Sequence, residues 1–241
     1  KFDPRSVAEV RYQSELDRWI LSQLNLLIDE VTTALEGYDP TTAGRRIQGF
    51  VDDLSNWYVR RSRRRFWKSE SDADKLAAHT TLYQCLVTLS KLLAPLTPFV
   101  SEEMYQNLVR SFYPEEPESV HLAEFPVADL SQVDEQLASD IALAMKVVSL
   151  GRAARDIKGI KVRQPLQKVW VQARSKGERE GLERVRSQVL EELNVQDMEF
   201  VDPDIKVLSY FADRDGEKYA VASDASGFTV VILTEIAPEL A

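Results

Sequence analysis

The feature that most constrains this chain is a three-and-four spacing of apolar residues that glycine and proline interrupt. It begins with Leu16, Ile20, Leu24, Leu27, Val31 and Leu35. This spacing predicts one long amphipathic helix, with Gly37 at its C-cap. Asp39 is a suitable N-cap and Pro40 a suitable first residue for a second helix, which we expect to run to about Lys68.

Two more helices are predicted in the first half. Ser71 or Asp72 can cap a third helix, apolar on two sides, which Pro95 ends. Thr97 and Pro98 then begin a fourth, and its apolar residues are Phe99, Val100, Met104 and Leu108. Because the connections are short, the four helices predict a bundle.

The second half changes in character. Residues 112–130 are rich in Pro, Glu and Ser, which predicts a surface connection that packs a few side chains on the bundle. A fifth helix is expected from about Gln132 to Lys158. After Pro165, apolar and polar residues alternate around a charged stretch at 177–193, which predicts a β-α-β unit.

The last residues contain short apolar runs at 207–211, 219–222 and 228–233, with turn signals between them. We therefore predict a mainly α protein that ends in a small α+β domain. Its expected parts are a helical domain over 1–130, a connecting helix with a basic turn over 131–165, and the α+β domain over 166–241.

Composition excludes several classes of function. No apolar run approaches the roughly 20 residues that span a bilayer, and Cys85, the single cysteine, forms neither an internal disulfide nor a multi-cysteine zinc site. The chain also lacks a glycine-rich phosphate loop, a nucleophile elbow and a histidine pair at metal spacing. We expect a cytoplasmic protein with no membrane partner, and no catalytic residue, metal site or cofactor in this chain. Its start at Lys1, without Met, is typical of an excised piece.

The net charge of −9 argues against a polyanionic partner, but the positive charge is concentrated. The stretch from Asn56 to Lys68 combines the cations Arg60, Arg61, Arg63, Arg64, Arg65 and Lys68 with the aromatic residues Trp57, Tyr58, Phe66 and Trp67. The predicted core stripe of this helix is Ala43, Ile47, Val51, Leu54 and Tyr58. The predicted adjacent basic face is Trp57, Arg60, Arg64 and Lys68.

Arg61 and Arg65 would continue the core stripe, where an unpaired guanidinium is costly. The helix end must therefore leave the core or meet carboxylates there. Arginine forks suit phosphates and tryptophan offers a stacking face for a base, so the segment is typical of a surface for single-stranded or loop RNA. The alternative is a solvated helix end whose cations complement the helix dipole.

A second basic segment lies where the fifth helix ends. It comprises Arg152, Arg155, Lys158, Lys161, Arg163 and Lys168, on both sides of Gly159. These residues could extend a surface that follows an RNA backbone. An ordinary polar loop after a helix would show the same pattern.

Residues 50–67, FVDDLSNWYVRRSRRRFW, closely resemble the anticodon-binding helix of isoleucyl-tRNA synthetases. Three flanking segments agree in order and approximate spacing: LDRWILS at 16–22, LLAPLTPF at 92–99 and GIKVRQPL at 159–166. The resemblance covers roughly residues 10–170, and residues 170–241 resemble the family only weakly.

The resemblance implies the C-terminal anticodon-binding region of a class Ia synthetase, with its helical bundle fold. The expected partners are isoleucine tRNA and the catalytic domain of the same polypeptide, in a monomer. ATP and Mg would serve the full-length ligase. The chain has no HIGH-like or KMSKS-like signature and no recognisable editing domain, so it is not expected to aminoacylate alone.

The predicted tRNA contacts are Trp57, Arg60, Arg61, Arg64, Arg65, Trp67, Lys68, Arg152, Arg155, Lys158, Lys161 and Arg163. Two alternatives stay open. The region could belong to a valyl, leucyl or methionyl synthetase, which share the helical domain. It could also be a protein-interaction module whose basic helix binds an acidic partner or a membrane surface.

Overall fold

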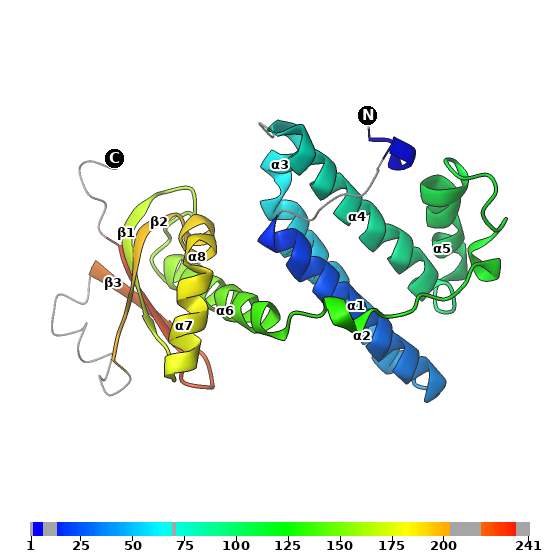
Figure 1. The fold of residues 1–241 in the computed structure, drawn as a ribbon. Coiled ribbons are helices and arrows are strands. Elements are labelled where there is room, and N and C mark those ends of the chain that lie inside the picture. The colour runs from blue at the N-terminus through cyan, green and yellow to red at the C-terminus, as the bar shows by residue number, and fades with distance from the viewer. Residues whose placement is uncertain (1, 7–13, 69–70, 203–217, 235–241) are drawn as a thin grey trace. The chain divides into compact units, whose positions relative to one another are not determined.

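A computed structural model describes residues 2–6, 14–68, 71–202 and 218–234 of the chain. It forms two compact units, Lys1–Glu135 and Gln136–Ala241. The first unit is helical, and the second combines helices with a sheet (Figure 1). The predicted mainly α fold with a small α+β part is confirmed.

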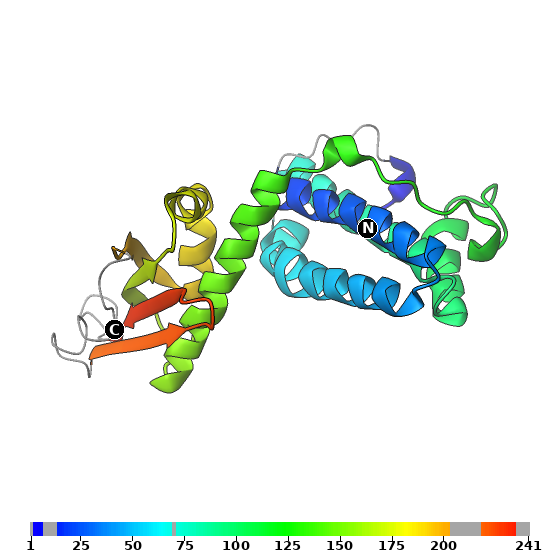
Figure 2. The same ribbon diagram turned by 90° about the horizontal axis from the view of Figure 1, so that it is seen from below.

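The first unit is a helical bundle, as predicted, and its described α-helices follow the expected order, with the second expected helix divided in two. They are α1 (Glu15–Glu36), α2 (Pro40–Asp53), α3 (Arg63–Lys68), α4 (Asp72–Leu93) and α5 (Pro98–Tyr105). The caps accept backbone hydrogen bonds: Ser14 from Leu16 at 3.1 Å and Asp39 from Thr42 at 3.0 Å. Figure 2 shows α1 and α2 side by side, in agreement with their extensive contact. The cap oxygens of Ser14 and Asp39 each accept from a backbone N–H that the helix itself leaves unpaired.

The second predicted helix differs from expectation in its continuity. After α2 the chain forms a π-helical segment, Leu54–Val59, and a turn at Ser62 precedes α3. π-helical turns inside helices occur often at functional sites. The arginine-rich residues Arg63–Lys68 therefore form a separate short helix, α3.

The core stripe of α2 also differs. Ala43, Ile47, Leu54 and Tyr58 are buried as predicted, but Val51 is 41% exposed. Steps of three and four from Ile47 lead instead to Phe50 and Trp57, each 5% exposed. These larger side chains bury more apolar surface than Val51 would, so the helix turns them inward.

The start of α5 is exposed rather than packed. Phe99 and Val100, two of the apolar residues of the fourth predicted helix, are 89% and 60% exposed. The buried face runs through Ser101 and Tyr105, and a π-helical segment, Gln106–Arg110, follows. Val120, from the predicted surface connection, belongs to the same buried cluster as Tyr105.

Short 3-10 turns occur at Pro4–Ser6, Val120–Leu122 and Leu130–Gln132.

The second unit contains the predicted β-α-β arrangement. Its elements are α6 (Glu135–Ile157), β1 (Leu166–Gln172), α7 (Lys176–Arg184), α8 (Arg186–Leu193), β2 (Val195–Phe200), β3 (Tyr219–Ser223) and β4 (Thr229–Leu233). The strand order is β2-β1-β4-β3, with β1 and β2 parallel and β4 antiparallel to both neighbours. The predicted helix at 177–193 is divided into α7 and α8 at Val185. The run at 207–211 lies outside the described residues.

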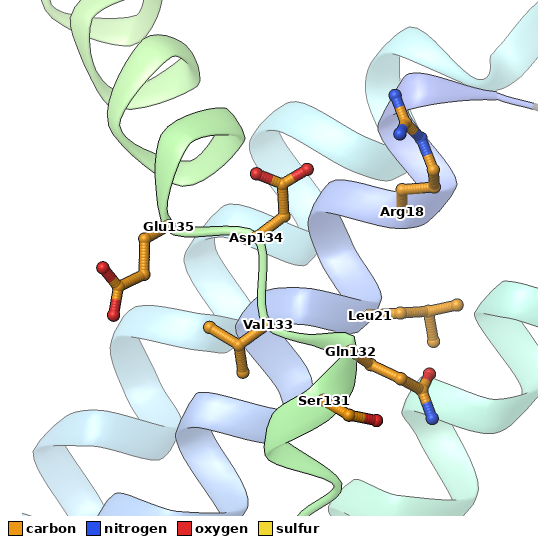
Figure 3. Close-up of a pocket in the computed structure, with 7 residues that line it drawn as sticks. All are labelled: Arg18, Leu21, Ser131, Gln132, Val133, Asp134 and Glu135. Carbon is orange, nitrogen blue, oxygen red and sulfur yellow. The ribbon is translucent and has the colours of Figure 1, made fainter.

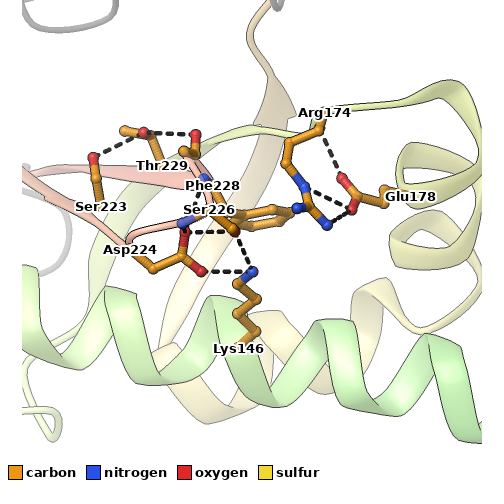
Figure 4. Close-up of polar contacts among 9 residues, drawn as sticks. Lys146, Arg174, Glu178, Ser223, Asp224, Ser226, Phe228 and Thr229 are labelled. Carbon is orange, nitrogen blue, oxygen red and sulfur yellow. Dashed lines mark hydrogen bonds and ion pairs between the residues drawn. The ribbon is translucent and has the colours of Figure 1, made fainter.

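Polar contacts fix the β3–β4 hairpin to α6 (Figure 4). Lys146 on α6 pairs with Asp224 at 2.5 Å and donates to the hydroxyl of Ser226 at 2.9 Å. Its ammonium also lies 4.9 Å from the centre of the Phe228 ring. The hydrogen bond from Lys146 is the main reason why the pKa of Asp224 lies far below its usual value. These contacts hold the sheet on its helix.

Candidate nucleic-acid interface

The helix α3 presents a basic and aromatic surface. Arg63 and Arg64 are exposed, and Trp67 is 74% exposed. Phe66 is buried at 8% exposure, and its ring lies edge-on to Trp67 with centroids 6.3 Å apart. One side of this short helix therefore packs on the bundle while the other offers two guanidinium groups and an indole face to solvent.

Arg65, between these exposed residues, points into the bundle. Its guanidinium donates two hydrogen bonds to the carboxylate of Asp17, at 2.8 and 2.6 Å, and one to Asp74 at 2.9 Å. The Asp17 side chain is 0% exposed, and the Tyr58 hydroxyl donates to it at 2.8 Å. The sequence predicts that this helix end either leaves the core or meets carboxylates there, and Arg65 meets carboxylates. The prediction that Arg65 contacts tRNA is corrected, because its donors are occupied inside the protein.

Electrostatics keep this network charged. Burial alone would lower the pKa of Arg65, but its bonds to Asp17 and Asp74 hold that pKa above the ordinary value. Burial, together with the charge of Asp17, raises the pKa of Tyr58 well above its usual range. Tyr58 therefore stays protonated and remains a donor. α3 is joined to α1 and α4 by charge-assisted hydrogen bonds, which are the stronger kind.

The remaining predicted tRNA contacts of this segment differ in their surroundings. Trp57 is buried, which corrects its predicted stacking role, and the guanidinium carbon of Arg61 lies 5.2 Å from the centre of its ring. Arg60 donates to the backbone carbonyl of Asn56 at 2.8 Å. Lys68 is the last residue of α3. The surface thus centres on Arg63, Arg64 and Trp67 rather than on the predicted face that includes Trp57.

In the second basic segment, Arg155 is 0% exposed. Its guanidinium donates to the carbonyls of Lys161 at 3.1 Å, Gln164 at 3.0 Å, Leu193 at 2.5 Å and Asn194 at 3.2 Å. Burial lowers the pKa of this group. The predicted tRNA contact by Arg155 is therefore corrected: the side chain is covered by protein and spans the turn and the end of α8.

Of the other cations in this segment, two form ion pairs and three are exposed. Arg152 pairs with Glu192 at 2.6 Å, and Lys168 pairs with Glu199 at 2.5 Å. Lys158, Lys161 and Arg163 are exposed. The turn after α6 therefore keeps three of the predicted residues at the surface.

A cavity of about 660 Å³ lies in the first unit between α1 and the segment before α6 (Figure 3). Arg18 and Leu21 line it from α1, and Asp134 and Glu135 line it from the other side. Carboxylates outnumber guanidinium groups in this lining, which is unfavourable for a phosphate. The cavity is not part of the basic surface.

Sequence reasoning missed two kinds of residue. Arg63 belongs to the basic run but is not among the predicted contacts, although it is exposed beside Arg64. The anchoring role of Asp17 was also missed. Its signal was readable, because Asp17 precedes Ile20 and Leu24 at helical spacing and so falls on the apolar stripe of α1.

The described residues show no group of three or more His, Cys, Asp or Glu side chains that could hold a metal. The ring of His79 stacks on that of Phe2, with centroids 5.4 Å apart, and its centroid lies 5.1 Å from that of Phe66. Cys85 is a free, buried cysteine. None of the helices in these ranges has the length and apolar character that crossing a bilayer requires.

The family to which this chain belongs follows from its sequence. Residues 17–170 match the anticodon-binding domain of tRNA ligases. Since this match covers more than half of the chain, the chain belongs to that family. The match begins at the third residue of α1 and covers α2 to α5 in full, including the arginine-rich α3.

The similar proteins are more specific. The isoleucine–tRNA ligase of Dehalococcoides mccartyi strain 195 is 58% identical over 226 residues, which are 94% of this chain and 22% of that protein. The isoleucine–tRNA ligases of Thermus thermophilus and Porphyromonas gingivalis are 51% and 42% identical, over 81% and 92% of this chain. The resemblance to isoleucyl-tRNA synthetases is confirmed. The chain spans about a fifth of the length of these relatives.

Proposed function

We propose that this chain binds the anticodon stem and loop of an isoleucine tRNA, as part of an isoleucine–tRNA ligase. The observation that carries the proposal is the outward display of Arg63, Arg64 and Trp67 on α3, around an Arg65 that is fixed in the core. The anchored helix holds its exposed groups in place before RNA arrives, which lowers the ordering cost of binding.

Each exposed group suits a part of RNA. The guanidinium groups of Arg63 and Arg64 match phosphate oxygens through paired hydrogen bonds. The face of Trp67 is available to an unpaired base, and such stacking is worth about 1–3 kcal/mol per base. A loop with splayed bases offers both features, whereas a continuous duplex hides its base faces.

The rest of the proposal concerns the longer protein. Ligation of isoleucine to tRNA, with ATP and Mg, would take place in regions that the relatives have beyond the fifth spanned by this chain. Here the chain itself would contribute binding and no catalytic residue. We expect the enzyme to be monomeric and cytoplasmic, with the catalytic domain of the same polypeptide as the second partner of this region.

Fluorescence anisotropy with labelled isoleucine tRNA tests the proposal. We expect tighter binding to the native anticodon than to the same tRNA with a swapped anticodon. Arg63→Ala with Arg64→Ala should weaken binding at least tenfold. The matched control is Arg45→Ala with Lys176→Ala, which removes two exposed cations elsewhere and should change affinity little. Equal affinity for both anticodons, or equal loss in the control, would contradict the proposal.

The two alternatives make different predictions. A valyl, leucyl or methionyl origin would give tighter binding to the corresponding tRNA, and the names of the relatives favour isoleucine. A protein-interaction module would bind anionic vesicles or acidic peptides as well as it binds tRNA. A competition assay with valine tRNA and with anionic vesicles separates the three.

A further inference from the structure

The turn after α6 is built around a buried cation. Arg155 is completely covered, and within the described residues its hydrogen-bond partners are backbone carbonyls rather than carboxylates. A buried charge is costly unless its surroundings compensate it. Leu193 and Asn194 supply the carbonyl end of α8, which carries partial negative charge. The cost of burying Arg155 is therefore offset by a helix terminus and by the turn.

The bonds of Arg155 fix the path of the turn. The carbonyls of Lys161 and Gln164 point inward to its guanidinium, and the side-chain amide of Asn194 donates to the carbonyl of Val162 at 3.0 Å. Gly159 has a φ of +67°, which lets the chain reverse after α6. Since these carbonyls face the protein, the turn is held in one conformation from the inside.

This conformation leaves the cations outside. Lys158, Lys161 and Arg163 are all exposed along a few residues of chain. Residues 157–165 contain no aromatic side chain, and the exposed apolar side chains there are Ile157 and Val162, at 66% and 39% exposure. A surface with clustered cations and no stacking platform attracts phosphates but cannot read bases.

We propose that the turn over residues 158–163 is a preformed, sequence-independent binding surface for the phosphate backbone of RNA, with Arg155 as its internal positioning residue. The inference rests on the proposed function and assigns a separate task within it. Base recognition belongs to α3, where Trp67 is exposed, and the turn adds affinity without discrimination. The RNA element that fits is a double-helical stem, whose phosphates are regularly spaced.

The first test removes the exposed cations. The chain carrying Lys158→Ala, Lys161→Ala and Arg163→Ala is titrated with native and swapped isoleucine tRNA and with a short RNA duplex. We expect at least a tenfold loss of affinity for all three RNAs, with an unchanged ratio between the two tRNAs. The slope of log affinity against log salt should become shallower by roughly two, because each phosphate that a cation neutralises accounts for about 0.7–0.9 of that slope.

The outcomes separate the two proposals. Unchanged affinity and slope in the triple variant, with anticodon discrimination intact, would overturn the role of the turn alone. Loss of the ratio between the tRNAs would overturn the division of tasks. If the unsubstituted chain does not distinguish the tRNAs, the proposed function fails. Binding of polyglutamate to the turn as tightly as the duplex would show a general anion surface instead.

The second test examines Arg155 as a positioning residue. Arg155→Lys, and the milder Asn194→Gly, are made in the original chain and in the triple variant. Gly tolerates the left-handed backbone of Asn194, at φ 49°, while it removes the bond to Val162. We expect each to weaken duplex binding about threefold in the original chain and to have no effect in the triple variant. Equal losses in both backgrounds would indicate a merely structural role and overturn the assignment.

Discussion

Arg65 and Arg155 are both buried arginines next to exposed basic residues, but their charges are met differently. Arg65 faces the carboxylates of Asp17 and Asp74, whereas Arg155 faces four backbone carbonyls. The first joins helices, so its partners come from distant parts of the bundle. The second joins a turn to a helix end, so its partners are the backbone itself.

The two anchors depend on different groups. The Arg65 anchor requires particular side chains, and loss of Asp17 leaves a guanidinium without its main counter-charge. The Arg155 anchor depends on a backbone path, which many sequences could supply. Loss of this arginine leaves no opposite charge without a partner. Removing the counter-charge of Arg65 should therefore lower the free energy of unfolding more than removing Arg155 does. Three predictions test this difference.

The largest effect is expected from Asp17→Asn. A buried ion pair that loses one partner costs about 3–5 kcal/mol, so the free energy of unfolding should fall by about 3 kcal/mol. Urea denaturation of the chain measures it. Asp17→Asn combined with Arg65→Met should lose less than Asp17→Asn alone, since no guanidinium remains buried. A larger loss in the double variant would refute the counter-charge account.

Arg155→Met should have an intermediate effect. Its carbonyl partners would lose their donors, at about 1–3 kcal/mol, while the cost of burying the charge would disappear. We expect a net loss of about 2 kcal/mol in the free energy of unfolding, again from urea denaturation. Lys161→Met is the control, because its side chain is exposed and its backbone carbonyl is retained. If Arg155→Met lowered the free energy of unfolding more than Asp17→Asn does, the expected order of the two anchors would be wrong.

The smallest effect on stability is expected from Trp67→Ala. Because its side chain is largely exposed, the free energy of unfolding should change by less than about 0.5 kcal/mol. Affinity for isoleucine tRNA should fall about tenfold, in line with the loss of one stacked base. Phe99→Ala, at another exposed aromatic, should change neither quantity. Equal tRNA affinity in the two variants would remove the stacking role of Trp67.

Much of the fold was predictable because helix signals are local. Caps such as Ser71 and Asp39 and the apolar spacing of α1 are fixed by neighbouring residues. The orientation of Trp57 was not predictable in the same way. Steps of three and of four from Ile47 lead to different faces, and only packing against the rest of the bundle selects Phe50 and Trp57 over Val51.

The candidate site was predictable as a region but not residue by residue. The arginine-rich run indicated a basic surface, yet Arg64 and Arg65 are neighbours with opposite environments. What separates them is Asp17, 48 residues earlier in the chain. Arg155 was hidden for a similar reason, since its carbonyl partners at the end of α8 carry no side-chain signal.

The salt dependence of tRNA binding measures how many phosphates each basic surface neutralises. Isoleucine tRNA is titrated at several salt concentrations with Arg63→Ala plus Arg64→Ala, with Lys161→Ala plus Arg163→Ala, and with the control pair Arg45→Ala plus Lys176→Ala. Each of the first two pairs should make the slope of log affinity against log salt shallower by roughly one and a half, because two phosphates are no longer neutralised, and the control should not. Slopes that match the control would contradict the account of two anchored basic surfaces that bind RNA.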